Sequence, residues 1–118
     1  MSLLVEYGFD VKHGRGHDFQ AWLSENETKF ADACPPGVEY VGTFSVIFAS
    51  EKHAGGSRQF FRLADYGAMD ALSTALKEEG TYASLFNEMF EFVDTEKGTD
   101  WSNGLYRSMS DVGMPASA

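Results

Sequence analysis

Charged side chains stand at alternate positions in stretches that otherwise look like β-strands. Glu6 lies in LLVEYGFDV, and Arg58 and Arg62 lie in SRQFFRL. Because successive side chains of a strand point to opposite faces, Glu6 and Arg62 can share one face of a sheet and meet across neighbouring strands. Arg58 and Arg107 can join them there. A carboxylate and arginines inside a cavity can bind an anionic or carbonyl-bearing small molecule through forked hydrogen bonds.

The same residues have a structural interpretation, because an ion pair can also set strand register or dimer specificity. Tyr106, next to Arg107, is the remaining candidate for ligand binding, although aromatic residues are more often core or interface fillers. No Ser-His-Asp order, phosphate-binding loop or zinc motif is present. The sequence therefore favours neither a hydrolase nor a kinase, and it identifies no catalytic residue.

Two histidines have a spacing found in metal sites. His13 and His17 are four residues apart, which on a helix would place both rings on one face. Gly14 and Gly16 interrupt the segment, however, and no third ligand is fixed, so surface histidines at a helix start are the preferred interpretation. The single cysteine, Cys34, excludes an internal disulfide and is expected to be structural. We predict neither a metal nor a cofactor.

The charge balance excludes some partners. The 118 residues contain 9 Lys and Arg against 18 Asp and Glu, a net charge of −9, and the arginines are scattered. Phosphate binding needs a concentrated basic surface, so nucleic acid and an anionic membrane are not expected partners. The first residues, MSLLVEYGFDV, lack the basic and apolar regions of a signal peptide. A cytoplasmic location is the corresponding expectation.

Hydrophobic periodicity predicts the elements that must position these residues. Strands are expected over Leu3–Val11, Val38–Ala49, Ser57–Leu63 and Trp101–Met109. One amphipathic helix is expected over Gly16–Ala33, and two more between Asp65 and Gly80 and from Thr81 to Val93. Gly42, in the middle of a strand, suggests a β-bulge or a close backbone approach. The strand register leaves open whether Tyr40 and Phe44 or Val41 and Ile47 share a face with Phe60.

The order strand, helix, strand, strand, helix in two pieces, strand is that of an α+β, ferredoxin-like βαββαβ domain. Right-handed crossovers place the helices on one face of a four-stranded antiparallel sheet, with the first and third strands central. We expect one domain over residues 1–110 and a flexible tail over 111–118. Because no helix remains to cover the apolar second face, we expect a homodimer whose sheets face each other.

The runs PPGVEYVGTF and FFRLADYGAMDAL resemble segments of the dimeric α/β-barrel superfamily, in particular NIPSNAP-like and antibiotic-biosynthesis-monooxygenase-like proteins. The similarity extends from about Leu3 to Met109. The features that carry it are Gly14–Gly16, Pro36–Gly37, Val41–Phe44 and Leu63–Tyr66.

The resemblance implies a homodimer and a ligand pocket between sheet and helices or in the dimer cavity. The haem-degrading branch of the superfamily uses an Asn, a Trp and a His, but the first strand here carries Glu6 and no Asn, which speaks against haem degradation. Three functions stay open: a small-molecule-binding protein, a cofactor-independent monooxygenase or isomerase acting on an aromatic or polyketide-like substrate, and a non-catalytic interaction or stress-associated module.

Overall fold

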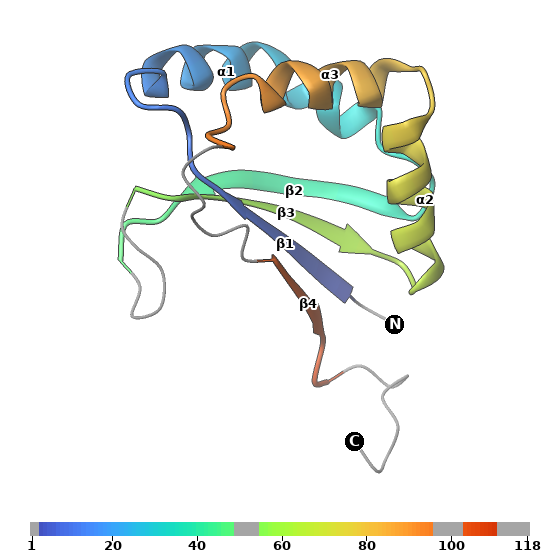
Figure 1. Cartoon of the computed structure of the whole chain (residues 1–118). Helices are drawn as coiled ribbons and strands as arrows, with labels where there is room; N and C mark the ends of the chain where they lie inside the picture. The colour runs from blue at the N-terminus through green and yellow to red at the C-terminus, as the bar shows by residue number, and fades with distance from the viewer. Residues whose placement is uncertain (1–2, 49–54, 96–102, 111–118) are drawn as a thin grey trace.

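The four strands form one antiparallel sheet in the order β2-β3-β1-β4 (Figure 1). The computed structural model describes residues 3–48, 55–95 and 103–110. The strands are β1 (Leu3–Phe9), β2 (Val38–Ser45), β3 (Ser57–Leu63) and β4 (Asn103–Arg107). The first and third strands are central, which confirms the predicted ferredoxin-like α+β arrangement.

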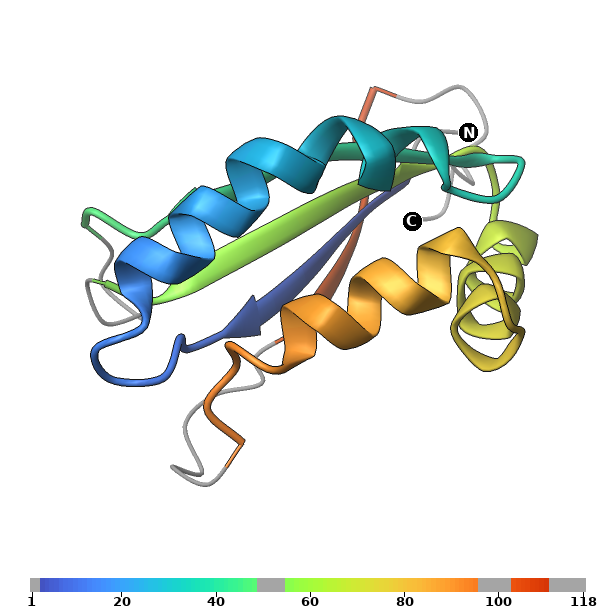
Figure 2. The ribbon, with the colours of Figure 1, turned by 90° about the horizontal axis from the view of Figure 1, so that it is seen from above.

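Three helices cover one face of the sheet (Figure 1). They are α1 (Gly16–Asp32), α2 (Gly67–Lys77) and α3 (Thr81–Phe90). Seen from above, α1 and α3 run side by side over the sheet, and α2 stands at one end (Figure 2). The turn from α1 into β2 closes with a hydrogen bond from the Val38 amide to the Pro35 carbonyl, 3.1 Å long. Gly37 has φ +84° there, a conformation that glycine adopts without strain.

The core lies between the helices and the inner face of the sheet. Alternate residues of β1 and β3 supply the floor, and apolar positions of the helices supply the cover. The buried members from the sheet are Leu3, Val5, Phe9, Phe61 and Leu63, and those from the helices include Phe19, Phe30, Leu72, Leu85 and Met89. The second face of the sheet, which we call the open face, is not covered by any helix of residues 3–48, 55–95 and 103–110 (Figure 1).

A β-bulge in β2 changes which side chains face the core. The pairing with β3 shifts between Tyr40, opposite Phe61, and Gly42, opposite Phe60. The extra residue, Val41, reverses the alternation, so Tyr40 faces the helices and Phe44 faces the opposite way. A bulge was one of the two expectations for Gly42. Of the alternative face sets, Phe44 shares the face of Phe60 but Tyr40 does not, and Ile47 of the other set lines a hollow together with Phe60.

Most element boundaries differ slightly from those expected. The first strand ends at Phe9, although Val11 still forms an isolated bridge to Val93, and β2 ends at Ser45. The predicted strand start at Trp101, the end at Ala49 and the expected tail 111–118 lie outside the described residues. Among the helices that the structure describes, none is both long and apolar enough to cross a membrane.

Candidate functional site

Three of the predicted site residues meet on the open face. The Arg58 Nε lies 3.4 Å from the Glu6 Oε2, and both side chains are buried, with exposed fractions of 6% and 4%. The Tyr106 hydroxyl donates a 2.5 Å hydrogen bond to the Glu6 Oε1. We call Glu6, Arg58 and Tyr106 the open-face cluster. Arg58 also donates to the Ser57 carbonyl through Nη1, but no hydrogen bond of its Nε is found among the described residues.

In strand β4, Gly104 leaves the space through which the Tyr106 side chain reaches Glu6. Gly104 is paired with Glu6, and the Tyr106 ring lies against the Gly104 Cα. A Cβ at position 104 would overlap the ring and the hydroxyl of Tyr106. The absence of a side chain therefore lets the ring lie along the strand and reach the carboxylate.

The two other predicted arginines do not join the cluster. Arg62 is opposite Leu4 on β1, whereas Glu6 is opposite Phe60, so Arg62 lies two residues along β3 from the position that faces Glu6 directly. Arg62 is exposed on the same open face. Arg107 is opposite Leu3, a core residue, so it lies on the helix side of the sheet and not with Glu6. The position of Arg107 follows from the register of β4, which pairs Arg107 with Leu3.

A hollow of about 430 Å³ surrounds the cluster, and its walls are mainly apolar. Its lining residues are Glu6, Phe44, Ser45, Val46, Ile47, Phe48, Arg58 and Phe60. Phe44 and Phe60 pack edge to face, with ring centroids 5.8 Å apart, yet Phe44 is 52% exposed. This combination of a buried charge pair and exposed aromatic rings is typical of an interface.

A second candidate site, which we call the inner cavity, lies between the sheet and helices α2 and α3. It has a volume of about 100 Å³ and is lined by Tyr7, Phe9, Gln59, Leu72, Leu76, Tyr82, Phe86, Met89, Phe90 and Val93. Its polar groups are the amide of Gln59 and the phenols of Tyr7 and Tyr82. Burial raises the pKa of both phenols, and the nearby Cys34 and Tyr7 raise that of Tyr82 further. Both phenols therefore stay protonated.

Gln59 is a residue of this candidate site that was not singled out from the sequence. It is only 1% exposed, and it sits on the helix side of β3 between Ser57 and Phe61. Its Nε2 donates to the Thr43 Oγ1 at 3.1 Å and to the Met89 Sδ at 3.3 Å. A signal was present in SRQFFRL, because the alternation that places Phe61 inside also places Gln59 there. A polar side chain at a core position is more informative than exposed charges.

Thr43 continues this network toward the surface. The Tyr40 hydroxyl lies 2.6 Å from the Thr43 Oγ1 and donates a 2.7 Å hydrogen bond to the Glu27 Oε2 on α1. Burial is the main cause that raises the pKa of Tyr40. The Thr43 hydroxyl opposes this, and the Glu27 carboxylate adds to it. Tyr40 and Thr43 share the helix side only because the bulge lies between them.

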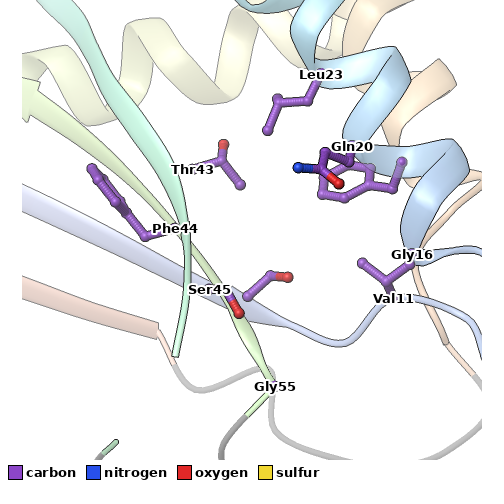
Figure 3. A pocket seen from close by; sticks show the side chains of 10 residues that line it. Val11, Gly16, Gln20, Leu23, Thr43, Phe44, Ser45 and Gly55 are labelled. Atoms are coloured by element: carbon purple, nitrogen blue, oxygen red, sulfur yellow. The ribbon is translucent and has the colours of Figure 1, made fainter. Parts of the chain in front are cut away.

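A third hollow, which we call the α1 groove, lies between α1 and the sheet (Figure 3). It has a volume of about 420 Å³, and its lining includes Phe19, Gln20 and Leu23 of α1. Thr43 points toward α1 in this view, whereas the neighbouring Phe44 points away (Figure 3). The hydroxyl of Thr43 thus stands between the α1 groove and Gln59 of the inner cavity.

His13, His17 and Cys34 are not among the residues that line these three hollows. His13 lies in the turn before α1 and His17 in its first turn, and both are exposed. Within the described ranges, no group of three or more His, Cys, Asp or Glu side chains is placed to hold a metal ion. Cys34 is half-buried, its Sγ donates to the Phe30 carbonyl, and burial raises its pKa to about 11.

Comparison with solved structures identifies proteins of the same fold. A NIPSNAP family protein from Agrobacterium tumefaciens superposes with a TM-score of 0.66 at 8% identity, covering 93% of this chain and 95% of its own. A NIPSNAP-like domain protein from Burkholderia xenovorans gives 0.66 at 9%, covering 92% and 86%. A mutant of SnoaB, a cofactor-independent oxygenase from Streptomyces nogalater, gives 0.53 at 18%, covering 96% and 98%.

At these identities the likeness concerns the fold alone. No family model matches the sequence, and no curated protein matches it. The resemblance expected from the sequence is nevertheless confirmed at the level of architecture. The chain has the ferredoxin-like fold that the NIPSNAP proteins share with the oxygenase SnoaB.

Proposed function

We propose that the protein is a homodimeric small-molecule-binding protein whose ligand is neutral, largely apolar and held in the inner cavity. The observation that supports this most directly is the lining of that cavity. It combines aliphatic and aromatic walls with one amide and two protonated phenols, and it includes no carboxylate, ammonium or guanidinium group among the described residues. Such a mixture of apolar walls and few polar groups is typical of ligand pockets.

The charged residues belong, in this proposal, to assembly and not to ligand binding. Glu6 and Arg58 neutralise each other on the open face, where Phe44, Phe60 and the hollow around them would be covered by a second copy. A two-fold axis would bring the same patch of each copy together. The arginines proposed from sequence as ligand-binding residues, Arg58, Arg62 and Arg107, do not line the inner cavity.

Catalysis without a cofactor is the second candidate, since SnoaB shares the fold. Oxygenation or isomerisation of this kind begins with removal of a proton from the substrate, which requires a base. Among the described residues that line the inner cavity, the titratable groups are phenols whose pKa is raised, so the cavity is better suited to binding than to deprotonation. Oxygen uptake on adding hydroxyaromatic compounds to the protein would favour the oxygenase instead.

The binding proposal can be tested by NMR titration with single-ring compounds. We expect neutral rings such as phenol and benzonitrile to shift amide signals around Gln59, whereas benzoate should not, because burying its charge is unfavourable. Leu76→Trp, at the rim of the cavity, should abolish the shifts by filling the mouth. Ser73→Trp, exposed on the same helix, is the matched control. Equal binding of benzoate, or binding unaffected by Leu76→Trp, would contradict the proposal.

A further inference from the structure

A chain of hydrogen bonds runs from Glu27 through Tyr40 and Thr43 to Gln59. The chemistry of these groups fixes which of them donates at each step. An ionised carboxylate only accepts, so the Tyr40 proton must point to Glu27. The 2.6 Å contact between the Tyr40 and Thr43 oxygens then needs the Thr43 proton. The Thr43 hydroxyl therefore has no proton left to donate to Gln59. It can only accept a hydrogen bond from that residue, and the NH₂ group of Gln59 is the donor.

This direction fixes the Gln59 amide, whose oxygen and nitrogen ends have almost the same shape. Met89 supports the same orientation, because its sulfur accepts from the second N–H. With both N–H groups used, the carbonyl oxygen of Gln59 receives no hydrogen bond from any residue in the part of the chain that the structure describes. A side chain that is 1% exposed thus presents an unused acceptor at the wall of the inner cavity.

We propose that Glu27, on the surface of α1, is a positioning residue that, through Tyr40 and Thr43, holds the carbonyl oxygen of Gln59 toward the inner cavity. The cavity then selects ligands that carry a hydrogen-bond donor, such as a hydroxyl or N–H group, over ligands of the same size that only accept. This selectivity rests on the proposed function, whereas the orientation of the Gln59 amide does not.

The chain can be reversed without touching the cavity. In Glu27→Leu the Tyr40 proton is free to point to Thr43, Thr43 can donate to the Gln59 oxygen, and the amide can turn its NH₂ group to the cavity. Glu25→Leu is the matched control, since Glu25 is exposed on the same helix and has no hydrogen bond or ion pair in the described structure. Thr43→Ser should preserve the chain, and Thr43→Val should interrupt it.

The first measurement needs no ligand. We expect Glu27→Leu to move the side-chain NH₂ signals of Gln59 in a ¹⁵N-correlated NMR spectrum, and those signals can be assigned by their loss in Gln59→Leu. The variant should also lower the pKa of Tyr40 in a spectrophotometric titration, because the carboxylate raises it. Glu25→Leu should change neither. If the Gln59 signals and the Tyr40 titration are the same in both variants, the chain does not orient the amide and the inference is wrong.

The second measurement compares phenol, which donates, with benzonitrile, which only accepts. The wild type should bind phenol about tenfold more tightly, since leaving a buried acceptor unpaired is costly. Glu27→Leu and Thr43→Val should remove this preference, and Thr43→Ser and Glu25→Leu should keep it. A preference that survives Glu27→Leu would overturn the inference while leaving the proposed function intact. If neither probe binds the wild type, the proposed function fails, and the orientation of the amide is decided by the NMR and titration results.

Discussion

At the scale of single residues, the polar side chains of this molecule are held by very local geometry. Tyr106 reaches Glu6 only because Gly104 has no Cβ, and Phe44 lies against Gly42 in the same way, with a Cβ there only 2.9 Å from the ring. In both strands a glycine two positions before an aromatic residue serves as a platform on the open face. The aromatic rings therefore lie along the sheet instead of standing away from it.

Replacing Gly104 by Ala should break the Tyr106 to Glu6 hydrogen bond. The new methyl group overlaps the ring, which must turn away, and the expected loss of unfolding free energy is about 1.5–3 kcal/mol, as for hydrogen bonds to charged groups. Tyr106→Phe should cost a similar amount. The double variant should be little worse than either single variant, because both remove the same interaction. If urea unfolding showed that the two single variants lose unfolding free energy additively in the double variant, Gly104 would have a role other than making room for the Tyr106 ring.

Cys34 should react slowly with alkylating reagents. Its pKa is raised by burial from 9.0 to about 11, so at pH 8 the thiolate fraction is roughly one-hundredth of that of an unperturbed thiol. The folded state holds the proton more tightly than the unfolded state, so stability is lost as the pH rises from about 9 toward 11. Iodoacetamide labelling with and without urea measures the first effect. Equal rates in both conditions would contradict it.

At the scale of the elements, the Glu6–Arg58 pair links the two central strands across the open face. Each partner is buried, so removing one leaves the other charge without compensation. The pair thus helps to fix strand register, because a slip of either strand by one residue would send the charge of that strand to the core face and separate it from its partner.

A double-mutant cycle should reveal this coupling. We expect Glu6→Leu and Arg58→Met each to lower the unfolding free energy by about 3–5 kcal/mol, and the double variant to lose much less than the sum. Arg62→Met, exposed on the same strand and face, should change stability by about 0.5 kcal/mol or less. If Glu6→Leu or Arg58→Met alone left the unfolding free energy unchanged, the pair would not stabilise the folded chain, and a role in binding a partner would be favoured instead.

The fold could be predicted from sequence because its signals are periodic and local. Alternation in β1 and β3, the helical stripes and the Pro36–Gly37 turn all indicated the observed order of elements. The face of each side chain depends on register, which sequence periodicity does not supply. One inserted residue at Val41 reversed β2, and the pairing of Arg107 with Leu3 removed that arginine from the cluster. Gln59 carries no charge and stands in a strand next to two arginines, so its burial follows only from the alternation that places Phe61 in the core.

At the scale of the whole molecule, one layer of helices and one sheet leave an apolar face without a partner in the described part of the chain. Phe44, Tyr106, Ile47 and Phe48 are exposed there or at its margin, and the buried charge pair lies among them. A second copy that covers this face would place the inner cavities on the two outer sides of the dimer, because each is lined by residues of α2 and α3 on the helix side of its own sheet.

Sedimentation at micromolar concentration should show a species of twice the 13.0 kDa chain mass. Phe44→Glu should shift it to monomer, because a carboxylate would be buried in the interface without a partner. Tyr66→Glu, equally exposed but at the start of α2, should leave the dimer unchanged. A wild type that stays monomeric, or a Phe44→Glu variant that stays dimeric, would exclude this face as the interface.

The bulge at Val41 also affects whether copies of the chain can pair through the edges of their sheets. Strands β2 and β4 are the two edges of the sheet, and an edge with free backbone groups can recruit another edge and grow into an aggregate. The bulge interrupts the regular pairing pattern of β2, and β4 is only five residues long. Neither edge offers a long, flat template. The irregularity that sends Tyr40 inward therefore also disfavours growth through the strand edge, whereas the contact through sheet faces that we propose would close after two copies.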